Sequence, residues 1–118
     1  MNFLLMHGAY PYGGELSALA KGFRNVYIDM SWMYIISPSY SARYLHEWLE
    51  TVPANKILAF GGDYHNVENT YAHSLMARAV ISKVLKENVG TGYLTEEEAL
   101  EIAQWIMRDN AIAFFKIK

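Results

Sequence analysis

Short runs of consecutive apolar residues alternate along the chain with longer stretches in which apolar residues recur every three or four positions. The short runs are rich in β-branched and aromatic residues and predict strands at residues 3–6, 25–31 and 57–60. The longer stretches predict helices at residues 15–22, 37–52, 69–88 and 95–107. Ser37-Pro38 opens the second of these helices, and a capping box formed by Thr95 and Glu98 opens the last.

This order of elements, βαβαβαα, decides the fold class. Strands separated by helices run parallel, because a crossover helix returns the chain to the same side of the sheet. The chain has 118 residues, of which 53% are apolar, and this is enough for one core. We therefore expect an α/β fold in a single domain over residues 1–118, with the three strands as neighbours in sequence order.

Composition and charge exclude several classes of partner. The formal net charge is −2 and the basic residues are scattered, so we expect no nucleic-acid partner. The chain has no cysteine, which excludes disulfides and thiolate zinc sites and leaves histidine and carboxylate as the strong metal ligands. The first residues, MNFLLMHGAYPY, have neither the basic region of a signal peptide nor the length of a membrane span. These features predict a cytoplasmic protein without a membrane partner.

Polar residues follow or close each predicted strand. His7 follows the first strand, Asp29 lies near the end of the second, and Asp63 and His65 follow the third, within the stretch KILAFGGDYHN. Parallel α/β sheets bind their ligands beyond the carboxyl ends of the strands, so these side chains are candidates for a functional site. Side-chain alternation counted back from His7 and Asp63 places four apolar residues on the inner face: Phe3, Leu5, Ile57 and Ala59.

Each candidate also has a purely structural interpretation. Asp63 could cap the following helix or stabilise a turn, and His7 could be a hydrogen-bonded core histidine. Asp29 shares the inward face and would need a partner there, so we interpret it as structural. Three tyrosines could line a pocket or simply pack: Tyr10, Tyr12 and Tyr34. Among the other residues, we expect His46 and His73 at the surface and the tryptophans, Trp32, Trp48 and Trp105, in the core.

Four motifs together resemble the C-terminal part of the amidohydrolase superfamily: LLMHGAYPY, NVYIDMSW, VPANKILAFGGDYHN and RDNAIAFF. The resemblance is to the amidohydrolase-related branch that includes aminocarboxymuconate semialdehyde decarboxylases and resorcylate decarboxylases, with uronate isomerases as distant relatives. These enzymes are metal-dependent (β/α)8 barrels. The resemblance therefore implies that the chain forms the last three β/α units of such a barrel, with an extra C-terminal helix.

The resemblance also implies roles for individual residues. Asp63 matches a strand-end aspartate that ligates a divalent metal, zinc or manganese, and exchanges a proton with the metal-bound water. His7 matches a histidine that contacts the substrate and polarises it or stabilises developing negative charge. We expect Tyr10 and His65 to contact the substrate, a small carboxylate or amide. The two glycines before Asp63 would leave room beside the site.

The departures from the family pattern are equally informative. A His-x-His pair and further ligands on earlier strands are absent, and a complete barrel takes about 250 residues. We therefore expect a fragment or truncated relative of a metal-dependent hydrolase or lyase that holds no metal tightly by itself. The alternative is a non-catalytic assembly module that self-associates as a homo-oligomer or completes a barrel with another chain, and so buries two open sheet edges and the apolar inner face.

The barrel resemblance makes one geometric prediction. Strands lie about 4.8 Å apart, so His7 and Asp63 should project from the same end of the sheet, roughly 10 Å from each other across the strand that carries Asp29.

Overall fold

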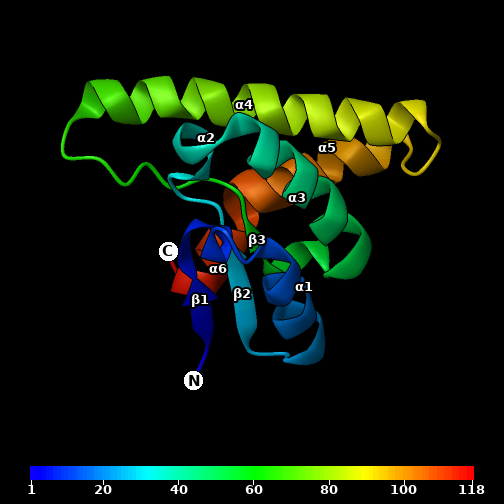
Figure 1. Cartoon of the computed structure of the whole chain (residues 1–118), viewed down its shortest axis with the longest axis horizontal. Coiled ribbons are helices and arrows are strands. Elements are labelled where there is room, and N and C mark those ends of the chain that lie inside the picture. Colours follow the sequence, from blue (N-terminus) through cyan, green and yellow to red (C-terminus); the bar gives the residue numbers. More distant parts are fainter.

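The computed structural model describes all residues, 1–118, as an α/β unit with a three-stranded parallel sheet (Figure 1). The sheet order is β1-β2-β3, formed by Phe3–Leu5, Val26–Asp29 and Ile57–Leu58. The helices are α1 (Gly13–Gly22), α2 (Met33–Ile36), α3 (Pro38–Thr51), α4 (Val67–Gly90), α5 (Glu96–Gln104) and α6 (Asn110–Phe115). Short 3₁₀ turns at Met6–Ala9 (η1) and Ala54–Lys56 (η2), and a π-helical turn at Trp105–Asp109 (η3), complete the chain.

The predicted strand directions and strand order are confirmed. β1 pairs with β2, and β2 with β3, in parallel. Two of the four predicted helix starts, those of α3 and α5, are also confirmed by their caps. The Ser37 side chain accepts a hydrogen bond from the Tyr40 amide, and Thr95 and Glu98 form the expected capping box. The helix α2 was not predicted.

The sheet has one apolar face covered by α1 and α3. Figure 1 shows these helices beside β2, with the long α4 lying across α2, α3 and α5 at the carboxyl end of the strands. Val26 and Ile28 of β2 are buried on the face toward α1 and α3 with Leu16, Leu45 and Trp48. No helix is both long and apolar enough to span a membrane.

The predicted inner face of the sheet was wrong in two of the three strands. The register pairs Leu5 with Ile28 and Ile28 with Ile57, so the predicted inner residues Phe3, Leu5 and Ile57 lie on the face of Ile28. Ala59 is fully buried in the same core. The opposite face carries Leu4, Tyr27, Asp29 and Leu58. The miscount has a physical cause: β1 and β3 end before His7 and Asp63, so alternation cannot be counted back from those residues.

The C-terminal segment closes the outer edge of β3, an edge expected to be open. Asn110 Nδ2 donates to the Ile57 carbonyl at 2.8 Å, and the Ala59 amide donates to the Ile106 carbonyl at 2.7 Å. The Tyr34 hydroxyl donates to the Ala59 carbonyl at 2.6 Å. The Ile106 carbonyl can accept the bond from Ala59 because η3 is π-helical. In this turn the Asn110 amide donates to the carbonyl five residues back, that of Trp105.

The same segment covers part of the other face of the sheet. Phe114 of α6 packs edge-on against Tyr27 with ring centroids 4.8 Å apart. In Figure 1, α6 and the C-terminus lie beside β1. The sheet therefore has one closed edge, at β3, and one edge without a neighbouring strand, at β1.

Candidate functional site

His7 and Asp63 meet beyond the carboxyl ends of the strands. His7 Nε2 lies 3.7 Å from Asp63 Oδ2, and the two side chains are 35% and 51% exposed. The predicted separation of roughly 10 Å was therefore wrong. It assumed straight strands, whereas both residues have left-handed backbones, with φ of +56° and +51°, which turn their segments toward each other across the end of β2.

Asp63 does not cap the helix that follows it. The cap of α4 is Asn66, whose side-chain oxygen accepts a hydrogen bond from the Asn69 amide at 2.9 Å. Asp63 is exposed and makes no hydrogen bond within the chain, so its carboxylate keeps its lone pairs for a ligand. This geometry excludes the capping interpretation of Asp63.

The His7 ring is oriented by the end of β2. Its Nδ1 lies 2.8 Å from the Ser31 carbonyl, which can only accept, so Nδ1 carries the proton. In the neutral ring, Nε2 therefore presents a lone pair on the side of Asp63. A histidine that ligates a metal commonly donates its other ring N–H to a backbone carbonyl in this way.

Asp29 is the last residue of β2, and only 5% of its surface is exposed. Its Oδ1 accepts a hydrogen bond from the Ser31 amide at 3.1 Å, and its Oδ2 accepts one from the Ser31 hydroxyl. Burial raises the pKa of the Asp29 carboxyl above its ordinary 3.8, and the two hydrogen bonds from Ser31 oppose that rise. Asp29 is thus satisfied locally, as the structural interpretation required.

Trp32 is a further residue of the site that the sequence assigned to the core. Its side chain is 40% exposed, and its ring centroid lies 6.0 Å from that of His7. Its φ is +63°, a conformation that costs free energy for a bulky residue. The three strands are thus each followed by a non-glycine residue in the left-handed conformation, namely His7, Trp32 and Asp63. The available signal was position: Trp32 comes three residues after the end of β2.

The two glycines before Asp63 allow close packing, and the room they were expected to leave is filled. A Cβ on Gly61 would lie 2.7 Å from Ser31 Cβ, and one on Gly62 would lie 2.7 Å from Thr70 Cγ2. The loop after β3 can therefore approach both the end of β2 and the first turns of α4 only without side chains at these positions.

The Tyr10 amide donates to the His7 carbonyl at 3.0 Å, but neither the Tyr10 nor the His65 side chain forms a hydrogen bond or ion pair with His7 or Asp63. Tyr10 packs edge-on against Tyr40 with centroids 4.7 Å apart. His65 is exposed and lines a shallow hollow of about 220 Å³ with Tyr64, Asn66, Val67 and Thr70. Their roles in substrate binding stay predictions.

One of the predicted surface histidines is buried. His73 is 1% exposed, and neither ring nitrogen has a hydrogen-bond partner. Its ring lies 5.5–5.6 Å from those of Tyr34, Phe60 and Tyr64, and its burial lowers its pKa below the ordinary 6.5. The prediction failed because the covering rings come from other segments. His46 is only partly exposed and bonds to Glu87 and Asn88 of α4.

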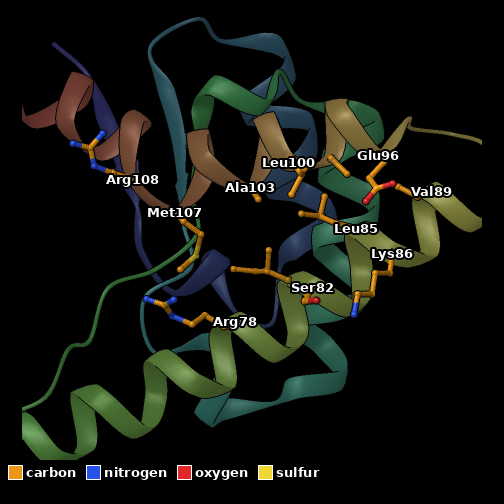
Figure 2. Close-up of a pocket in the computed structure, with 12 residues that line it drawn as sticks. Arg78, Ser82, Leu85, Lys86, Val89, Glu96, Leu100, Ala103, Met107 and Arg108 are labelled. Atoms are coloured by element: carbon orange, nitrogen blue, oxygen red, sulfur yellow. The ribbon is translucent and has the colours of Figure 1, made fainter.

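A larger cavity lies elsewhere, between α4 and the C-terminal helices. It measures about 730 Å³ and is mainly apolar. Figure 2 shows Leu85 and Ala103 in its walls, with Arg78 and Arg108 near Met107 at one end. No residue of the strand-end site lines it, so we place the candidate site at the strand ends, where the chemistry-bearing groups converge.

Comparison with known proteins identifies the family. The family model described as amidohydrolase matches residues 1–117. The chain belongs to the amidohydrolase family. Protein fluG of Emericella nidulans is 28% identical over 118 residues, a match that covers 99% of this chain and 14% of fluG.

A solved structure gives the same result for the fold. The crystal structure of a protein described as a "putative metal-dependent hydrolase", from Lactobacillus casei, superposes with a TM-score of 0.75 at 24% identity. The match covers 96% of this chain and 29% of that protein. The chain thus spans less than a third of the length of either relative, and the structural likeness establishes the α/β arrangement of its elements.

Proposed function

We propose that the chain forms the last three β/α units of a metal-dependent amidohydrolase barrel and supplies one side of its active site. The observation that carries the proposal is the approach of His7 Nε2 to Asp63 Oδ2, 3.7 Å, beyond the carboxyl ends of parallel strands. The family match and the description of the structural relative as a "metal-dependent hydrolase" support it.

The two residues fit a divalent metal as members of a larger ligand set. Asp63 offers an unbonded carboxylate and His7 a lone pair at Nε2. No group of three or more potential ligands gathers anywhere in the chain, whereas tight zinc sites use three or four protein ligands. In the proposed enzyme, the remaining ligands come from additional polypeptide.

Asp63 would hold the ion, zinc or manganese, with those ligands. A bound ion would supply a water of lowered pKa and would polarise the substrate carbonyl. Asp63, half-exposed and free of hydrogen bonds, would accept a proton at Oδ2. His7 faces the same space with an orientation fixed by the Ser31 carbonyl, and the half-exposed Trp32 ring forms a wall beside it. The substrate is a small carboxylate or amide.

Metal titration of the 118-residue chain tests this assignment. We expect weak binding of Zn²⁺ by calorimetry, lost in Asp63→Asn and reduced in His7→Gln, without turnover by the chain alone. His46 and Glu87 provide a matched control, because their facing atoms lie 2.7 Å apart on the surface. Binding that His46→Gln abolishes and Asp63→Asn leaves intact would refute the proposal. Submicromolar binding by the wild-type chain would refute the need for outside ligands.

A second function, assembly, is favoured by the difference between the two sheet edges. The edge of β3 is closed by Asn110, Ile106 and Tyr34, so a second copy cannot add a strand there. The Phe3 amide donates to the Asn25 carbonyl, on the side of β2. Because the backbone groups of successive residues in a strand point to opposite sides, the amide and carbonyl of Leu4 point outward from β1. Phe3, which is 46% exposed, flanks this edge.

We propose that two copies pair through β1 across a twofold axis. Analytical ultracentrifugation should show a dimer that Phe3→Lys converts to monomer. The matched control is Phe23→Lys, which changes a 57% exposed phenylalanine at the far end of α1. A wild-type monomer at tens of micromolar would exclude the dimer.

A further inference from the structure

The end of β2 connects the two halves of the candidate site. The Ser31 carbonyl accepts the Nδ1 proton of His7 at 2.8 Å. The Cβ of Ser31 lies so near Gly61 that a Cβ added to this glycine would lie 2.7 Å from it. Ser31 therefore touches both His7 itself and the loop that carries Asp63.

Ser31 is in turn held by a single buried side chain. Both polar groups of Ser31 that can donate, its amide and its hydroxyl, bond to the carboxyl oxygens of Asp29. Ser31 and Asp29 are 4% and 5% exposed, so water does not compete for these bonds. Rotation of the Ser31 peptide unit would break at least one of them.

We propose that Asp29 and Ser31 are positioning residues that lock His7 in the Nδ1–H tautomer and keep its Nε2 lone pair directed at the space beside Asp63. Both hydrogen bonds of Asp29 come from Ser31, and none comes from His7. Asp29 acts through Ser31, whose carbonyl is fixed in the direction that His7 needs. The importance of this unit for catalysis rests on the proposed function, whereas the tautomer it sets does not.

This arrangement explains two features that the site alone leaves without a cause. The first is why a carboxylate is retained in a buried position where desolvation opposes its charge. The second is why Gly61 lacks a side chain, since any Cβ there would push Ser31 away from His7. Both features follow if the position of the Ser31 carbonyl matters.

Long-range ¹H–¹⁵N NMR of the histidine rings tests the proposal at about pH 8.5, two units above the ordinary histidine pKa. His7→Gln identifies the His7 signals by their loss. We expect the wild-type ring to be protonated at Nδ1. Ser31→Ala keeps the carbonyl and the Cβ but removes the hydroxyl, and Asp29→Ala removes both acceptors.

Ser31→Ala, which loses one hydrogen bond, should shift the tautomer ratio toward Nε2–H by about fivefold, and Asp29→Ala, which loses two, should shift it further. Asp29→Asn keeps one acceptor oxygen for the Ser31 amide and should give an intermediate ratio.

Ser41→Ala is the matched control. Ser41 is also fully buried, and its hydroxyl donates to the Ser37 carbonyl at 2.9 Å, in α3. Its loss should lower stability without changing the His7 tautomer. An unchanged tautomer in folded Ser31→Ala and Asp29→Ala, or a wild-type ring protonated at Nε2, would overturn the proposal.

The metal titration of Asp63→Asn is a separate measurement. If the tautomer shifts as expected but no metal binds, the positioning unit stands and the proposed function fails.

Discussion

At the carboxyl ends of the strands, His7, Trp32 and Asp63 hold left-handed backbone conformations, and their side chains are partly exposed. At the outer edge of β3, Ile57 and Ala59 are fully buried and their outward polar groups are bonded by the C-terminal helices. Strain and unpaired groups gather where a ligand would bind, and hydrogen bonds gather where the sheet must be closed. The two regions should therefore respond differently to substitution.

Gly8 follows His7 in the turn after β1 and should give the largest effect. Its φ is +56°, and a Cβ would lie 2.7 Å from the fully buried Trp48 ring. Gly8→Ala should lower the free energy of unfolding by about 3 kcal/mol, from strain and overpacking combined. Urea denaturation followed by circular dichroism measures it.

Gly14, in the first turn of α1, is the matched control because a Cβ added there would meet no other atom within 4 Å. Gly14→Ala should raise stability by about 0.5–1 kcal/mol. Equal losses in both variants would show that Gly8 is not held by packing.

The closed edge of β3 should give the next largest effect. The Asn110 side chain donates two hydrogen bonds of 2.8 Å, to the carbonyls of Ala54 and Ile57. Asn110→Ala should cost about 2 kcal/mol, because a buried carbonyl loses its partner. Gln104→Ala removes an exposed hydrogen bond to Asp109 in the same segment and should change stability by less than about 0.5 kcal/mol. A small effect at Asn110 would mean that the edge is closed by packing alone.

The sequence predicted the elements that are specified locally. The strand order follows from the alternation of strands and helices, and the starts of α3 and α5 follow from their caps. The sequence also placed His7 and Asp63 at the same end of the sheet. These features depend on neighbouring residues or on the general geometry of parallel sheets, and both can be read from one chain.

The missed features depend on contacts between distant segments. The burial of His73 comes from Tyr34, Phe60 and Tyr64, and the closure of β3 comes from a π-helical turn that exposes the Ile106 carbonyl. The predicted distance between His7 and Asp63 was wrong for a related reason, because left-handed residues after the strands bend the chain. No periodicity of apolar residues encodes such a bend.

His73 packs against Phe60 and Tyr64, which flank Asp63 in the sequence. Its substitution should give a smaller, pH-dependent effect on stability. Burial lowers its pKa in the folded state, so the unfolded state binds the proton more readily. Stability from this group is therefore present above the unfolded pKa of about 6.5 and is lost as the pH falls through the lower folded value. The titratable rings that face it are tyrosines, which titrate far above this range.

His73→Leu should flatten the loss of stability between pH 7 and about pH 5, measured by urea denaturation at each pH. His65→Leu is the matched control, because it makes the same change at an exposed histidine. An unaltered slope in His73→Leu would indicate that other titratable groups cause the loss of stability at low pH. The sign for Asp29 is opposite: burial raises its pKa, so its charged form destabilises the fold as the pH rises through that value.

The smallest effect is expected at Asp63, and it separates the site from the fold most directly. Asp63 is exposed, caps nothing and has φ of +51°, so the fold gains little from its side chain. Glycine adopts this conformation without cost, whereas alanine does not. Asp63→Gly should thus be more stable than Asp63→Ala by about 1 kcal/mol, with Asp63→Asn near wild type. Chemical denaturation of the three variants gives this order. If Asp63→Gly is less stable than the wild type by more than about 1 kcal/mol, the aspartate serves the fold, and the contrast between a strained site and a closed edge is lost.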